Sequence, residues 1–235
     1  MSTPAHEGSK RSGSSPREFT IEVGPAAVSA LYLRPRGARA LLVLAHGAGA
    51  GMRHPFMKAV ADRLAAHGIA TLRYQFPYME GDRRRPPDRK SVLLATVHAA
   101  VTRGRRLARG VPLLAGGKSM GGRMTSLAAA EGSLDGVTGI VFFGFPLHPP
   151  GKPSSDRAAH LAEVAPPMLF LQGTRDALAD LSRIRSVCRT LGSRATLRVI
   201  RGGDHSFHVL KRSGRTDDEV LEELAEEVDR WVSGT

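Results

Sequence analysis

The sequence contains a single cysteine, Cys188, among its 235 residues. An internal disulfide needs two cysteines and a cysteine-based zinc site needs several, so both are excluded. Cys188 shares one helical face with apolar residues of the segment 181–191, and we expect it in the core. Long apolar runs are also missing: no stretch approaches the ~20 residues of a membrane span, and residues 1–17 lack the apolar region of a signal peptide. We therefore expect a cytoplasmic protein with no membrane partner.

Acidic and aromatic residues are scarce. The 22 Asp and Glu residues stand against 34 Lys and Arg, which leaves a net charge of +12, and aromatics make up 5% of the chain. Such a charge can mark an anionic partner such as nucleic acid, a membrane surface or an acidic substrate. Few aromatic side chains are available to stack on bases, however, and arginine supplies most of the positive charge along the whole chain. We interpret the charge as compositional and do not expect nucleic acid as a partner. The sequence makes no prediction of the oligomeric state.

Apolar content is ordinary, at 41%, and 235 residues suit one α/β domain. Residues 1–17 are rich in Ser, Gly, Pro and basic residues and cannot bury enough apolar surface to order themselves, so we predict a disordered tail there and one domain over 18–235.

Apolar runs alternate with helical patterns along this domain. After a hairpin pattern at 19–33, the alternation predicts a mostly parallel sheet with helices on both faces. No segment between strands is long enough for a large lid domain. The expected strands are 40–45, 69–74, 111–115, 137–143, 168–171 and 195–200, and the expected helices are 54–67, 89–109, the segment after Ser119, 181–191 and 217–232.

The chain is organised around Val111 to Ala130, which holds G-x-S-x-G with Ser119 at its centre. A strand-like run precedes the motif and a helix-like run of small residues follows it. In α/β-hydrolases this arrangement is the nucleophile elbow, where serine occupies a strained strand-to-helix turn. We therefore predict Ser119 as the nucleophile and the N–H of Met120 as an oxyanion donor. The alternative is an ordinary strand–helix turn.

A second glycine-rich turn, H-G-A-G-A-G, follows the buried run 40–45. In this position of a hydrolase sheet it supplies the other oxyanion donor, which we assign to the N–H of Ala48, and Gly47 is a candidate substrate contact. The competing interpretations are a tight turn or a phosphate-binding loop, although neither G-x-G-x-x-G nor the Walker pattern is present.

Candidate acids follow the run 168–171. Asp176 lies just beyond the strand end, whereas Asp180 stands where the next helix begins and suits a helix cap. We predict that Asp176 is the acidic residue that orients the catalytic histidine.

Three histidines follow buried runs and could act as the base. His46 opens the glycine turn and is expected to hold it. His205 is the first imidazole after the flexible pair Gly202-Gly203, and His208 follows three residues later. Ligands bind beyond the carboxyl ends of strands in open parallel sheets, so these histidines, Ser119 and Asp176 are expected at one edge.

Candidate substrate contacts are less specific. Lys118 could favour acidic substrates or anchor the elbow. Phe76 and Tyr78 could line a pocket or pack under a loop, and Phe145 follows the run 137–143 in a proline-rich loop. The chemistry requires no metal or organic cofactor.

Six motifs resemble a family of α/β-hydrolases related to dienelactone hydrolases, whose relatives include a hydrolase-like subunit of a histone-acetyltransferase complex. The motifs are H-G-A-G-A-G, Y-Q-F-P-Y, G-G-K-S-M-G-G-R, G-F-P-L-H-P-P-G-K, L-Q-G-T-R-D and G-G-D-H-S-F. The resemblance implies an α/β-hydrolase fold and a catalytic triad of Ser119, Asp176 and His205.

We therefore predict a serine hydrolase that cleaves a small ester, thioester or lactone, with a small-molecule acyl substrate. The alternative is a catalytically silent interaction domain of the same fold, associated with nucleic acid through its basic surface.

Overall fold

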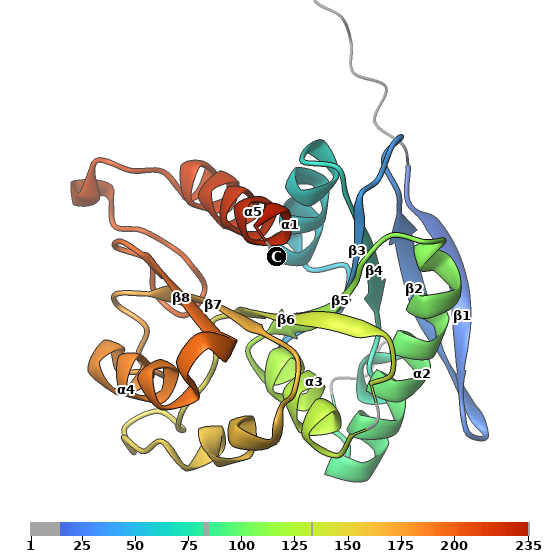
Figure 1. Cartoon of the computed structure of the whole chain (residues 1–235), viewed down its shortest axis with the longest axis horizontal. Coiled ribbons are helices and arrows are strands. Elements are labelled where there is room, and N and C mark those ends of the chain that lie inside the picture. Colours follow the sequence, from blue (N-terminus) through green and yellow to red (C-terminus); the bar gives the residue numbers. More distant parts are fainter. Residues whose placement is uncertain (1–14, 82–84, 133, 235) are drawn as a thin grey trace, which may run out of the picture.

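The computed structural model describes residues 15–81, 85–132 and 134–234. Its centre is one eight-stranded sheet in the order β1-β2-β4-β3-β5-β6-β7-β8 (Figure 1). Most of the predicted disordered tail, residues 1–14, lies outside the described residues, and the first strand begins at Arg17.

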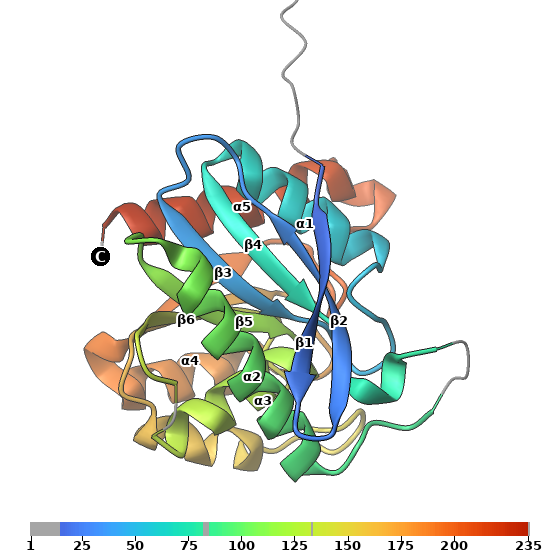
Figure 2. The same cartoon turned by 90° about the vertical axis from the view of Figure 1, so that its right-hand side faces the viewer.

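The predicted hairpin is confirmed at one edge of the sheet. Strand β1 (Arg17–Val23) pairs antiparallel with β2 (Ala26–Leu33), and β2 pairs antiparallel with β4 (Ile69–Tyr74), as Figure 2 shows. All further pairings are parallel and bring the carboxyl ends of the strands to one edge. The remaining strands are β3 (Ala40–Ala45), β5 (Leu113–Lys118), β6 (Val137–Phe143), β7 (Met168–Gly173) and β8 (Ala195–Ile200).

Helices cover both faces of the sheet, as the alternating pattern predicted (Figure 1). Helices α1 (Pro55–Ala66) and α5 (Asp217–Ser233) lie on one face. Helices α2 (Lys90–Ala108), α3 (Met120–Ala130) and α4 (Leu181–Leu191) lie on the other. Strand β3 is buried on both sides: Leu41 and Val43 face one core, Leu42 and Leu44 the other. Burial on both faces explains why this strand is a continuous apolar run.

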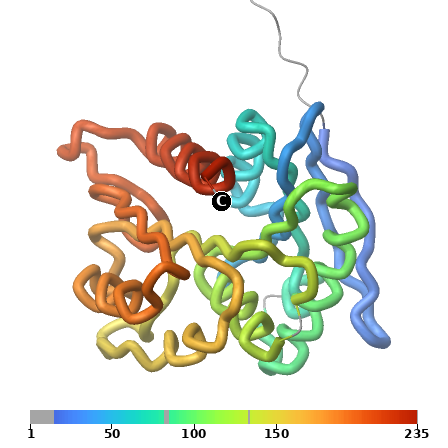
Figure 3. The backbone as a smooth tube through the Cα atoms, viewed as in Figure 1, coloured from blue at the N-terminus to red at the C-terminus, as the bar shows by residue number. Residues whose placement is uncertain are grey.

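Helix α5 lies beside α1, although the two are far apart in the sequence (Figure 3). A capping box of Thr216 and Glu219 begins α5. Its acidic face then pairs with basic side chains of the neighbouring helix: Arg63 contacts Asp218, and His67 Nε2 lies 2.7 Å from Glu222. The acidic helix therefore neutralises part of the molecule's positive charge within the fold.

Four short 3₁₀ helices complete the described chain, and the sequence pattern predicted none of them. The longest, η2 (Asp156–Glu163), lies between β6 and β7, where we expected only a loop. The described part of the chain forms no separate lid domain. The others are η1 (Pro77–Met79), η3 (Gly192–Arg194) and η4 (Lys211–Ser213). None of the helices in the described residues has both the length and the apolar character that crossing a bilayer requires.

Candidate active site

Ser119 occupies a strained turn between β5 and α3. Its φ of 52° and ψ of −117° place a non-glycine residue in a conformation that costs energy. The neighbouring chain passes so close that a Cβ at position 117 would lie 2.5 Å from the Ala45 carbonyl oxygen, and one at 121 would lie 2.5 Å from that of His46. Only glycine fits at Gly117 and Gly121, so the G-x-S-x-G spacing has a direct steric cause.

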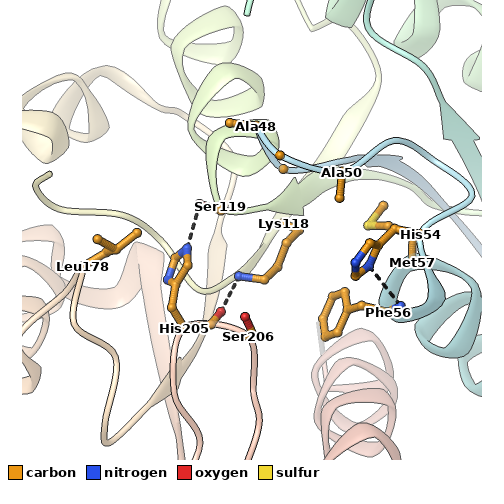
Figure 4. Close-up of a pocket in the computed structure, with 12 residues that line it drawn as sticks. Ala48, Ala50, His54, Phe56, Met57, Lys118, Ser119, Leu178, His205 and Ser206 are labelled. Carbon is orange, nitrogen blue, oxygen red and sulfur yellow. Dashed lines mark hydrogen bonds between the residues drawn. The ribbon is translucent and has the colours of Figure 1, made fainter. Parts of the chain in front are cut away.

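A chain of hydrogen bonds joins Ser119, His205 and Asp176. The Ser119 Oγ lies 2.8 Å from His205 Nε2, and His205 Nδ1 lies 2.8 Å from Asp176 Oδ2 (Figure 4 shows the first contact). Because the carboxylate accepts the Nδ1–H, Nε2 is left as the acceptor for the serine hydroxyl. The structure therefore brings together the three side chains that the sequence nominated from separate strand ends.

The Asp176 carboxylate is held almost completely out of solvent, with its side chain 1% exposed. Its Oδ1 accepts the N–H of Leu178 at 2.8 Å, and its Oδ2 accepts a hydrogen bond from the Gln172 amide. These bonds fix the orientation of the carboxylate toward His205 and satisfy a charge that burial would otherwise penalise.

The competing acid and the later histidine have other contacts. Asp180 is the N-cap of α4 and accepts the N–H groups of Ser182 at 2.9 Å and Arg183 at 3.2 Å, as predicted for a helix cap. The exposed His208 places its Nδ1 2.8 Å from Asp217 Oδ2, at the start of α5. Residues 205 and 206 form a turn and no helix runs through 204–208, so His205 and His208 do not share a helical face.

The glycine turn rests on buried ring side chains. His46 accepts the Phe76 N–H at Nε2, 3.0 Å away, and its Nδ1 lies 2.8 Å from the Gly47 carbonyl oxygen. Burial lowers the pKa of His46 to about 4, so the ring is neutral and holds the loop as predicted. The Tyr78 hydroxyl donates to the Ala48 carbonyl at 2.8 Å.

Three aromatic residues that the sequence nominated as substrate contacts are core residues instead. Phe76, Tyr78 and Phe145 are at most 1% exposed, and none of them lines the cavity above Ser119. Phe145 packs its ring against Phe142 and Phe170 under the sheet edge. An aromatic residue after a strand can pack in the core as well as line a pocket, and all three residues pack in the core here.

A cavity of about 330 Å³ opens over Ser119. Its walls come from the glycine turn, the start of α1 and the loop after β7 (Figure 4). Apolar contacts dominate these walls, which suits a small acyl group. The lining residues are Gly47, Ala48, Gly49, Ala50, His54, Phe56, Met57, Lys118, Ser119, Leu178, His205 and Ser206.

The two predicted oxyanion donors, the N–H groups of Met120 and Ala48, come from different elements. Met120 is the first residue of α3, and the first N–H groups of a helix have no acceptor within it. They also carry the positive end of the helix dipole. Ala48 is exposed in the glycine turn and lines the cavity. The two predicted oxyanion donors thus belong to the segments that flank Ser119.

Lys118 also lines the cavity, but its ammonium group is already engaged. It donates a hydrogen bond to the backbone carbonyl of His205. Burial lowers the pKa of Lys118 to about 8, against the opposing attraction of Asp176 and Asp204. The sequence left open whether Lys118 favours acidic substrates or anchors the elbow. This contact favours a structural role, although it holds the histidine loop rather than the elbow.

Sequence reasoning missed two residues of this site. Gln172 links the Asp176 carboxylate to the N–H of Phe145, which its Oε1 accepts at 3.0 Å. The signal in the sequence was that Gln172 is the one polar residue of the apolar strand β7. Gly144 follows β6 with φ +73°, and a Cβ there would lie 3.2 Å from Lys118 Nζ and 3.5 Å from His205 Nδ1. Any side chain at 144 would enter the hydrogen-bonded cluster.

A second Ser–His contact lies outside this cavity. Ser126, in α3, places its Oγ 2.8 Å from His160 Nε2 in η2 and 3.0 Å from the Arg123 carbonyl oxygen. Within the described residues, no group of three or more His, Cys, Asp or Glu side chains is placed to hold a metal ion.

The strand order and the elbow define an α/β-hydrolase fold. A family model described as alpha/beta hydrolase domain matches residues 38–233, and the chain belongs to this family.

Solved structures of similar fold cover nearly the whole chain. A dienelactone hydrolase from Anabaena variabilis is 22% identical, with 94% of this chain and 99% of that chain covered and a TM-score of 0.74. An alpha-beta serine hydrolase homologue from Coxiella burnetii is 19% identical, covering 92% and 97%, with a TM-score of 0.73. A serine hydrolase without lid from Xanthomonas campestris is 20% identical, covering 92% and 95%, with a TM-score of 0.72.

Proposed function

We propose that this protein is a serine hydrolase that cleaves a small carboxylic ester, thioester or lactone through an acyl-enzyme intermediate. The observation that carries the proposal is the hydrogen-bonded chain Asp176–His205–Ser119 at the floor of an open cavity. The words hydrolase and esterase in the names of proteins with a similar fold agree with this reaction class.

In the first half of the reaction, Ser119 Oγ bonds to the acyl carbon while its proton passes to His205 Nε2. The resulting imidazolium is stabilised and oriented by Asp176. The bond from the acyl carbon to the leaving oxygen or sulfur then breaks, and His205 returns the proton to that atom. In the second half, water attacks the acyl-serine with the same proton transfers and regenerates Ser119.

The negative charge on the carbonyl oxygen requires donors fixed before the reaction. We assign the N–H groups of Met120 and Ala48, each worth ~3 kcal/mol of transition-state stabilisation. The buried Tyr78 hydroxyl and His46 ring brace the glycine turn that carries Ala48. Phe76 and Tyr78 would thus assist by holding the loop rather than by touching substrate.

Fluorophosphonate labelling tests this proposal directly. The probe should modify one serine, and mass spectrometry of the digested protein should place the adduct on Ser119. A panel of p-nitrophenyl esters of increasing acyl length, with a thioester and a lactone beside it, then defines the substrate. Rates should be highest for short acyl groups because the cavity measures about 330 Å³.

A folded protein that neither reacts with the probe nor hydrolyses any of these substrates would contradict the proposal. That result would favour the catalytically silent domain that the sequence left as an alternative. An adduct on Ser126 instead of Ser119 would leave a serine hydrolase but overturn the assignment of its site.

A further inference from the structure

The backbone of the histidine loop is tied to the elbow through a side chain that the mechanism above does not use. Lys118 is the last residue of β5 and directly precedes Ser119. Its ammonium donates to the carbonyl oxygen of His205, and no other described residue donates a hydrogen bond to that oxygen. The residue before the nucleophile therefore holds the backbone of the residue that accepts the nucleophile's proton.

The backbone of this loop is also tied to the segment after β7, where the Gly203 carbonyl accepts the N–H of Arg175 at 2.9 Å. The contact to Lys118 adds a tie between the backbone of His205 and the elbow strand. Asp204 accepts the N–H groups of Ser206 at 2.8 Å and His208 at 3.0 Å. Phe207 has a φ of 65°, so the backbone two residues after His205 is strained. The Phe207 side chain is buried, and the ammonium adds a charge-assisted hydrogen bond that helps this strained turn to keep one conformation.

Lys118 is itself held in place on several sides. Its Nζ lies 5.9 Å from the centre of the Phe56 ring and 5.4 Å from that of Phe207, within the range of cation–π attraction. These two rings are stacked, with centroids 5.8 Å apart. Gly47 and Gly144 leave room for the stem and the ammonium, respectively. The ammonium thus joins the elbow, the start of α1 and the histidine loop.

We propose that Lys118 is a positioning residue that keeps His205 aligned with Ser119 by holding the carbonyl of its backbone. The proposal rests on the proposed function, since alignment of the base matters only if Ser119 attacks a substrate. Asp176 orients the imidazole ring, and Lys118 fixes the backbone from which that ring extends.

Three substitutions at one position separate the parts of this role. Lys118→Met keeps the stem but removes the donor and the charge, Lys118→Gln keeps a donor, and Lys118→Arg keeps both. Lys58→Met is the matched control, because Lys58 is exposed on α1 and pairs only with Asp62 in the following turn. Circular dichroism and thermal unfolding establish that each variant is folded.

We expect Lys118→Met to lower kcat by ~100-fold, the cost of a misplaced catalytic group, with little change in KM. Lys118→Arg should recover most of that loss, Lys118→Gln a smaller part, and Lys58→Met should match the unsubstituted protein.

Amide hydrogen exchange of residues 203–208 gives a readout that does not depend on turnover. Faster exchange in Lys118→Met, with recovery in Lys118→Arg, supports the proposal that Lys118 holds the backbone of His205. A failure of the unsubstituted protein to react with a fluorophosphonate would refute only the proposed function, and the exchange result would still stand. Unchanged exchange together with unchanged kcat overturns the proposal for Lys118. A raised KM with unchanged kcat also overturns it, because Lys118 would then bind substrate directly. If Lys118→Met does not fold, the comparison of Lys118→Gln with Lys118→Arg decides by the same measurements.

Discussion

Two Ser–His hydrogen bonds of the same length, 2.8 Å, occur in this molecule in opposite surroundings. Ser119 stands on a strained turn at a strand end and borders a cavity, whereas Ser126 lies two turns further along the same segment, inside α3, and is fully buried. The distance between the oxygen and the ring nitrogen does not distinguish them. Their access to substrate does.

The two imidazoles differ as well. His205 has the Asp176 carboxylate on its far nitrogen, which can stabilise an imidazolium. Among the residues that the structure describes, no carboxylate contacts His160. Burial, followed by the nearby charges of Arg123 and Lys90, lowers the pKa of His160 to about 4. A ring held neutral in this way can accept a hydrogen bond but is poorly suited to take up a proton during a reaction. The first pair is thus suited to chemistry and the second to packing η2 against α3.

Replacing each serine with alanine separates the two pairs most sharply. Ser119→Ala should reduce kcat by ~10⁶-fold and abolish fluorophosphonate labelling, because the nucleophile is lost. Ser126→Ala should leave turnover nearly unchanged and lower the free energy of unfolding by ~1 kcal/mol, the net worth of one hydrogen bond. Ester hydrolysis and urea unfolding measure the two effects. Full turnover by folded Ser119→Ala protein would refute the assignment.

The next comparison concerns the two histidines of one loop. His205→Ala should lose nearly as much turnover as Ser119→Ala, since the proton acceptor is gone. His208→Ala should keep most of its activity and the acidic limb of kcat/KM, because His208 contacts Asp217 at the start of α5. Measuring kcat/KM against pH for both variants checks this. An inactive His208→Ala protein beside an active His205→Ala protein would show the reverse assignment.

A smaller loss of kcat is expected when Asp176, the carboxylate that orients His205, is replaced. Asp176→Asn should lower kcat by ~10⁴-fold, because an amide no longer stabilises the imidazolium and can favour the wrong tautomer. Asp180→Asn should remain close to the unsubstituted protein, since asparagine also caps helices well. Steady-state kinetics on the same short ester compares the two. The assignment fails if Asp180→Asn shows the larger loss of kcat.

The sequence predicted most elements of this fold because their signals are local. Asp180 caps a helix and Leu191 precedes Gly192, so α4 was predicted over its observed bounds, 181–191. The hydrogen-bonded side chains at the strand ends were also predictable, because parallel strands bring their carboxyl ends together and each chemical group directly follows such a strand. The order of these groups along the chain added information that no single motif carries.

The rest depended on which loops meet in space. Nothing local shows that Lys118 reaches the carbonyl of His205 or that Gly144 leaves room beside it. An aromatic residue after a strand has the same apolar pattern in a core as in a pocket, so Phe76 and Tyr78 could not be placed from the sequence. Segment η2 escaped prediction because proline and serine dominate the loop that precedes it, and the packing of His160 on Ser126 that holds it is a tertiary contact.

The half-buried His160 also makes a prediction for the response of the fold to acid. The pKa of His160 is lowered to about 4 in the folded protein, from an ordinary value of 6.5. As the pH falls below about 6.5, the unfolded chain therefore takes up a proton that the folded protein does not, and the free energy of unfolding decreases until the pH reaches about 4.

His160→Gln keeps a polar group near Ser126 but cannot titrate. Its free energy of unfolding should therefore fall less steeply between pH 6.5 and pH 4, by at most about one proton's contribution to the slope. His46, whose pKa burial also lowers to about 4, supplies a similar dependence that persists in the variant. Ser126→Ala is the matched control, because it removes the hydrogen bond and keeps the imidazole. Urea unfolding at several pH values measures the slopes. Equal slopes of unfolding free energy against pH in His160→Gln and Ser126→Ala would contradict this prediction. They would show that His160 takes up its proton alike in the folded and the unfolded protein, so that the Ser126–His160 pair is less buried than its packing indicates.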